Sequence, residues 1–159
     1  MNLLGHAFDP ITMLEISYSS RLLVAALLGM AIGLERSLAG KHAGMRTYAM
    51  VALGSSLFVI LGTLASYELS IFSGINPLQI AGSIVIGIGF IGSGLAAFKG
   101  DHIEVTTASG IWVVAAVGMA TGFGLYILAI AGTIISLLIF SILSRFERVM
   151  RANYGSEAK

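Results

Sequence analysis

The sequence has no cysteine and few charged residues. Without cysteine, the 159-residue chain forms neither a disulfide framework nor a thiolate metal site. Aspartate, glutamate, lysine and arginine together make up 11% of the chain, and the net charge is +1. Because a chain so close to neutral has no overall electrostatic attraction for phosphate backbones, nucleic acid is not an expected partner.

The residue arrangements that mark an enzyme are also absent from the sequence. It shows no nucleophile, histidine and carboxylate set and no phosphate-binding loop. Gly87, Gly89 and Gly92 spell a GxGxxG pattern, but no strand precedes them, so they lack the context of a dinucleotide site. We predict that the protein is not an enzyme.

Apolar residues, in contrast, make up 57% of the chain, and the mean hydropathy is +0.93. The most informative run is Leu78 to Phe98, which has 21 residues without a charge. About 20 apolar residues suffice for a helix to cross a bilayer. The composition and this run together predict an integral membrane protein in a single domain.

The other apolar runs set the number of spans. A first span is expected over 22–34, extended backwards over 14–21, and a second over about 47–65. The 38 uncharged residues from 106 to 143 are too long for one crossing, and Gly122-Phe123-Gly124 is a turn signal that divides them. We therefore predict an all-α fold, a polytopic transmembrane helical bundle of about five spans.

Five spans place the chain ends on opposite sides of the membrane, and the basic residues decide the orientation. With the C-terminus inside, eight of the nine lysines and arginines face the cytoplasm and only Arg21 faces outward. We predict an outer N-terminal segment over 1–20, a five-span transmembrane domain over 21–145 and a short cytoplasmic tail over 146–159.

The third span is rich in glycine, which in membrane helices lets neighbouring backbones approach closely. At 100° per residue, Ile84, Ile88 and Ile91 form a bulky stripe opposite a face of small residues. We interpret the stripe as lipid-facing and the small face as packed, which makes this span the central helix. Alternatively, the glycines also leave room for a ligand, an ion or helix movement. The predicted helix-packing residues are Gly29, Gly33, Gly82, Gly87, Gly89, Gly92 and Gly94.

The two loops predicted to be cytoplasmic, with the helix ends beside them, hold most polar residues. We predict a functional polar cluster of Glu35, Arg36, Arg46, Thr47, Asp101 and Thr107. Glu35 and Arg46 lie at span ends, where an unpaired charge is costly, so we predict an ion pair between them. Glu35, Asp101 and Glu104 offer oxygen ligands suited to Mg²⁺, the alternative being solvated loop residues. No other cofactor is expected.

Two stretches resemble the signatures of the MgtC/SapB family. The first is LGMAIGLERSLAGKHAGMRTYAMVALGSSLF, with Glu35-Arg36 and Arg46-Thr47. The second is IGIGFIGSGLAAFKG followed by TTASGIW. Together they cover about residues 22–122, and the chain is identified as a member of this family.

The resemblance implies a multi-pass protein of the bacterial or archaeal inner membrane, linked to adaptation to low magnesium and, in pathogens, to virulence. It implies a modulator of other membrane machinery, such as ATP synthase or transporters, acting through helix contacts and the basic cytoplasmic rim. The alternative is a transporter or channel for magnesium or another small cation. A homo-oligomer is expected in either case. We expect this chain to lack the soluble C-terminal domain that many members carry.

Overall fold

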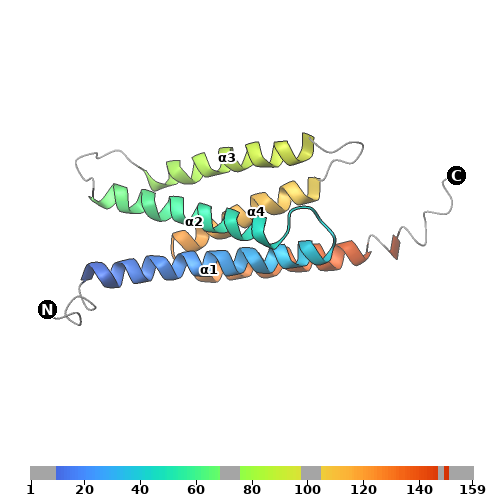
Figure 1. Ribbon diagram of the computed structural model, residues 1–159, viewed down its shortest axis with the longest axis horizontal. Helices are drawn as coiled ribbons and strands as arrows, with labels where there is room; N and C mark the ends of the chain where they lie inside the picture. The colour runs from blue at the N-terminus through green and yellow to red at the C-terminus, as the bar shows by residue number, and fades with distance from the viewer. Residues whose placement is uncertain (1–9, 69–75, 98–104, 147–148, 151–159) are drawn as a thin grey trace.

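The computed structural model describes residues 10–68, 76–97, 105–146 and 149–150 and shows a helical bundle in which consecutive helices run in opposite directions (Figure 1). No β-strand occurs in these ranges, so the predicted all-α polytopic bundle is confirmed. The helices are α1 (Pro10–Leu38), α2 (Met45–Glu68), α3 (Pro77–Ala97), α4 (Val105–Gly122), α5 (Tyr126–Leu138) and the π-helical turn η2 (Ile139–Leu143), which continues α5.

Four segments of the described chain are long and apolar enough to cross a membrane. They are Leu14–Leu38 in α1, Met45–Ser66 in α2, Val105–Gly122 in α4 and Tyr126–Phe146 across α5 and η2. The remaining helix, α3, has 21 residues, which corresponds to about 31 Å and thus to the thickness of the hydrocarbon core. The helices follow the predicted order, and α1 extends back to Pro10.

The predicted turn between the last two spans is confirmed. α4 ends at Gly122 and α5 begins at Tyr126. Gly124 has φ of +79°, in the left-handed region that glycine adopts without a steric penalty. The backbone N–H of Leu125 donates to the carbonyl of Ala120, which closes the end of α4 (2.8 Å).

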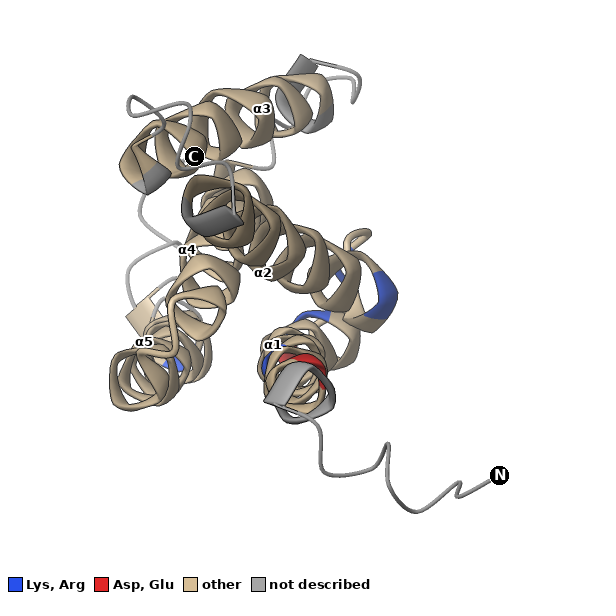
Figure 2. Ribbon diagram, turned by 90° about the vertical axis from the view of Figure 1, so that its left-hand side faces the viewer, with Lys and Arg blue, Asp and Glu red and all other residues tan. Residues whose placement is uncertain are grey.

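α4, and not α3, is the central helix of the bundle. It contacts α1, α2, α3 and α5, and nine of its 18 residues are buried. Among the described helices, α3 contacts only α2 and α4, and it lies on the opposite side of them from α1 and α5 (Figure 2). The prediction that the third span is central is therefore wrong.

α1 and α2 pack backbone to backbone through two glycines of α1. A Cβ atom placed on Gly29 would lie 2.6 Å from the carbonyl oxygen of Tyr48, and one on Gly33 would lie 2.7 Å from the Cα of Met45. Such distances leave no room for a side chain. The GxxxG pair thus lies in the tightest contact between the first two helices, as small residues allow in membranes.

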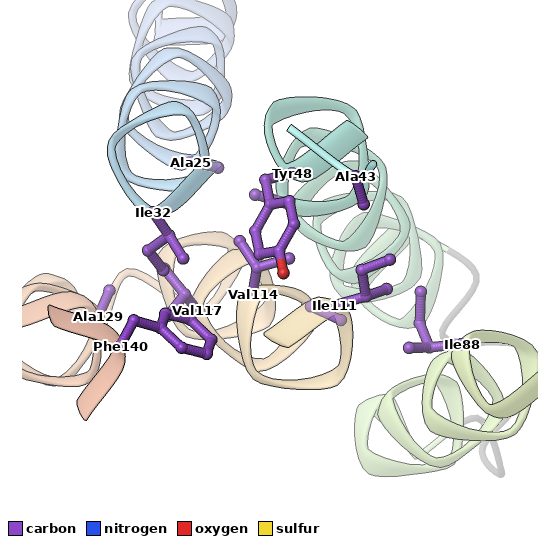
Figure 3. Packing of buried hydrophobic residues seen from close by; sticks show 12 residues of the cluster. Ala25, Ile32, Ala43, Tyr48, Ile88, Ile111, Val114, Val117, Ala129 and Phe140 are labelled. Atoms are coloured by element: carbon purple, nitrogen blue, oxygen red, sulfur yellow. The ribbon is translucent and has the colours of Figure 1, made fainter. Parts of the chain in front are cut away.

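The rotation of α3 about its axis differs from the predicted orientation, although Ile91 of the predicted lipid stripe is 43% exposed. Ile88, assigned to the lipid stripe, is only 8% exposed and belongs to the apolar core that Figure 3 shows. A Cβ atom on Gly92 would meet only Ala108, at 3.7 Å. Lipid tails and helix interiors are equally apolar, so bulky residues alone do not identify the lipid side. Nothing lies within 4 Å of a Cβ placed on Gly82, Gly87, Gly89 or Gly94.

Candidate functional site

A buried arginine lies at the end of the bundle where α1 connects to α2, the end predicted to be cytoplasmic. Arg36, in the last turn of α1, is 3% exposed. Its Nε donates to a carboxylate oxygen of Glu35, and Nη2 completes the ion pair. A buried charge of this kind is stable only when it is paired and hydrogen-bonded.

An aromatic ring covers the other side of this guanidinium. The Cζ of Arg36 lies 3.8 Å from the centre of the Phe140 ring, a cation–π contact. Phe140 is the buried residue of η2. π-helical turns are rare and recur at functional sites, because they change which side chains face the neighbouring helices.

A buried tyrosine joins α2 to α4 beside this ring. The side chain of Tyr48 is fully buried, and its hydroxyl donates to the carbonyl of Thr107 at 3.4 Å. A Cβ atom on Gly110 would overlap that hydroxyl and lie 2.9 Å from Cζ of Phe140. Figure 3 shows Tyr48 and Phe140 pointing towards α4 from two different helices. We call this set the Arg36 cluster: Glu35, Arg36, Tyr48, Thr107, Gly110 and Phe140.

The structure brings three of the predicted polar residues, Glu35, Arg36 and Thr107, into the Arg36 cluster. The predicted pair between Glu35 and Arg46 is wrong, because the carboxylate of Glu35 pairs with Arg36 instead. The physical reason is burial, since Arg36 is enclosed and needs the nearest carboxylate more than a solvated arginine does. Arg46 is exposed and lines a polar hollow with Thr47.

The predicted magnesium ligands are only partly within the described chain. Asp101 and Glu104 lie outside the described residues, so a site formed by Glu35, Asp101 and Glu104 stays a prediction. Among the described residues, no group of three or more histidines, aspartates and glutamates is placed to hold a metal ion.

The sequence did not predict three members of the Arg36 cluster, namely Tyr48, Gly110 and Phe140. Tyr48 follows Arg46-Thr47 directly and Gly110 lies within TTASGIW, so their position inside the signatures was an available signal. Phe140 stands in a long apolar run and gives no local signal. Its role depends on η2, which a plain 3.6-residue periodicity does not predict.

A second arginine joins two helices at the opposite end of the bundle. Nη1 of Arg21 donates to the carbonyl of Gly122 at 2.9 Å, and its Cζ lies 5.0 Å from the centre of the Tyr18 ring. The last carbonyls of α4 carry the negative end of its dipole, which a cation stabilises. Arg21 therefore joins α1 to the end of α4.

Comparison with known proteins assigns this chain to a family. The model of the MgtC family matches residues 22–149, a range that contains the whole Arg36 cluster. The chain belongs to the MgtC family. No solved structure matches it.

Several curated relatives of this family member carry names linked to magnesium or to the family. A protein of Escherichia coli named putative magnesium transporter YhiD is 39% identical over 138 residues, covering 84% of this chain and 64% of the relative. Protein MgtC of Salmonella typhimurium is 38% identical over 142 residues, covering 89% of this chain and 58% of the relative. Protein SapB of Bacillus subtilis is 34% identical over 140 residues, covering 86% and 58%. The chain thus spans about three fifths of the length of these relatives.

Proposed function

We propose that this MgtC-family protein modulates other membrane proteins during adaptation to low magnesium, through contacts of its exposed helix faces and its basic cytoplasmic rim. ATP synthase and transporters are the class of partner that the family resemblance suggests. The observation that carries the proposal is the close packing of α1, α2 and α4, which favours contact over conduction.

The bundle interior is filled by backbone contacts. A Cβ atom on Gly118 would overlap the backbone of Ala52, and one on Gly122 would lie 2.8 Å from the carbonyl oxygen of Ser56. The small cavity between α3 and α4 measures about 20 Å³. A cavity of this volume holds about one water molecule, so it does not admit a hydrated ion.

The buried hydroxyl groups of α4 and α5 donate hydrogen bonds to carbonyl groups of their own helices. Thr121 donates to the carbonyl of Gly118, Thr133 to that of Ala129, and Ser136 to that of Gly132. Transport pathways use polar groups that face a cavity or one another at mid-membrane. Hydroxyls that bond to their own helix instead support an architectural role.

The exposed face of α3 is the surface that we assign to partner contact. Ile86 is 77% exposed and Phe90 is 81% exposed, and they stand one turn apart on the same side of the helix. The open glycines Gly82 and Gly89 flank them, so a partner helix finds both bulky and small groups there.

A growth assay tests the assignment of this face. Phe90→Ala is expected to leave the protein folded and to abolish its support of growth at low magnesium, in a host strain that depends on this family. Ile127→Ala, on the 87% exposed side chain of α5, is the matched control and should complement fully. Equal complementation by both variants would remove α3 from the proposal.

A transporter is the second candidate, favoured by the name of the Escherichia coli relative. Its pathway would follow the open glycine face of α3 between copies of the chain. Magnesium flux into proteoliposomes that contain only this protein separates the two functions. Flux above that of empty vesicles would reject the modulator, whereas none is expected if the protein acts by contact.

A further inference from the structure

An apolar groove separates α2 from α3 along part of their length. The two helices meet at one end, where the side chain of Ile80 occupies the space that a Cβ atom of Gly62 would take. They diverge towards the end at which α2 begins, as Figure 1 shows. The groove between them measures about 480 Å³.

Two glycines facing each other keep this groove open. Gly54 of α2 and Gly87 of α3 both line it, and nothing lies within 4 Å of a Cβ atom on either. Ile88 is buried at its base, whereas Met50 and Phe58 are largely exposed along its α2 wall. The groove is therefore an apolar channel in the surface of the bundle, lined by α2 and α3.

A polar hollow lies one helical turn beyond the apolar groove. Arg46 and Thr47 precede Met50 and Val51 by four residues each, so they stand on the same sides of α2. With Ser37 and other residues of the α1–α2 connection, they line a hollow of about 270 Å³. Arg46 is exposed, and no carboxylate of the described residues pairs with it.

We propose that the groove and the hollow together bind one anionic phospholipid, with an acyl chain between α2 and α3 and its phosphate at Arg46. The charge pattern identifies the ligand, because an apolar channel that ends at a surface cation without a carboxylate partner among the described residues matches a lipid tail and an anionic headgroup. A basic residue at the membrane surface attracts anionic lipid, and the positive end of the α2 dipole adds to that field.

The exposed charge of Arg46 favours an anionic lipid over a second copy of the chain. A helix from a second copy would fill the apolar groove without using the charge of Arg46. The bound tail would fill the space between α2 and α3, next to the face of α3 that packs against α4. The position of α3 would then depend on the lipid composition of the membrane.

The full-length protein, reconstituted in vesicles of equal parts phosphatidylglycerol and phosphatidylcholine, allows a direct test. Lipids retained after mild detergent extraction are counted by native mass spectrometry. Gly54→Leu and Gly87→Leu place a side chain in the groove, and the Cβ atom of each meets nothing within 4 Å. Gly82→Leu is the matched control, since that site is equally open and lies outside the groove. Arg46→Gln removes the cation, and Arg145→Gln is its exposed control.

The parent protein should retain one phosphatidylglycerol, and the two groove variants should lose it. Arg46→Gln should lower the preference for phosphatidylglycerol over phosphatidylcholine about five-fold, while both controls behave as the parent. Equal retention by the parent and all variants would overturn the proposal. The proposal would also be overturned if the groove variants kept the lipid but no longer formed a dimer that the parent forms. The occupant of the groove would then be a second copy of the chain.

A labelling experiment on the parent protein keeps the test independent of how the variants fold. Phosphatidylglycerol with a photoreactive group in its acyl chain should label the segments around Phe58 of α2 and Ile91 of α3, which line the groove. Labelling spread over α5, which is exposed to lipid but does not line the groove, would show ordinary bilayer contact and reject the site.

Discussion

Gly118 of α4 lies against the backbone of Ala52, whereas Gly89 of α3 has nothing within 4 Å of the place where a Cβ atom would stand. Both helices are rich in glycine, and both lie in the apolar part of the chain. In α4 the missing side chains admit the backbone of α2. In α3 they leave an open face and one wall of a groove.

The difference shows that glycine content in a membrane helix indicates space and not contact. Small residues permit close approach, but a second helix has to take the space. α4 has α1, α2, α3 and α5 around it, while α3 has only α2 and α4 among the described helices. The same composition therefore produces a rigid centre in one helix and a free surface in the other.

The largest expected effect compares these two glycines directly. Gly118→Leu should destabilise the bundle by at least about 3 kcal/mol, because its side chain has to displace the α2 backbone. Gly89→Leu should purify and melt like the parent. Thermal melting in detergent with size-exclusion chromatography measures both. Equal stability of the two variants would abolish the contrast between α4 and α3.

The next effect compares a buried arginine with an exposed one. Arg36→Ala leaves the carboxylate of Glu35 without its partner and uncovers the Phe140 ring, so a loss of about 2 kcal/mol is expected. Arg46→Ala should change stability by less than about 0.5 kcal/mol, since its side chain is solvated. Unfolding by sodium dodecyl sulfate measures the stability of both variants. A larger loss for Arg46→Ala than for Arg36→Ala would contradict the stabilising role of the buried ion pair.

The sequence predicts the helices well because the physics that sets them is local. Uncharged length and the Gly122–Gly124 turn signal act within one segment at a time. The arrangement of the helices is not local. Ile88 and Gly89 are adjacent, and only the shapes of α2 and α4 decide which of them is buried.

The candidate site was predictable only in part, for the same reason. Glu35, Arg36 and Thr107 were identified because charged and hydroxyl side chains at span ends are conspicuous in an apolar chain. The pairing of Glu35 with Arg36 instead of Arg46 depends on the burial of Arg36 beneath Phe140. That burial is a property of η2, which lies more than one hundred residues further along the chain.

A smaller effect distinguishes the two sides of α3. Ile88→Ala removes a core side chain, and the loss should be about 1 kcal/mol, because in a membrane only packing contacts are forfeited. Ile86→Ala, at a 77% exposed position, should be silent, since lipid takes the vacated space. The same denaturation assay compares them. A larger loss at Ile86 would restore the orientation that the bulky stripe suggested.

The smallest effect concerns the hydroxyl of Tyr48. Tyr48→Phe removes a long hydrogen bond to the carbonyl of Thr107 (3.4 Å), and such bonds between membrane helices average about 0.6 kcal/mol. The ring itself keeps its place between α2 and α4. A loss above about 2 kcal/mol would mean that hydrogen bonding, and not shape, holds α4 at the centre.

Gly110→Ala supplies the sharper control, because its methyl group would strike the same hydroxyl first. If shape is decisive, Tyr48→Phe should partly rescue Gly110→Ala, a coupling that a double-mutant cycle measures directly.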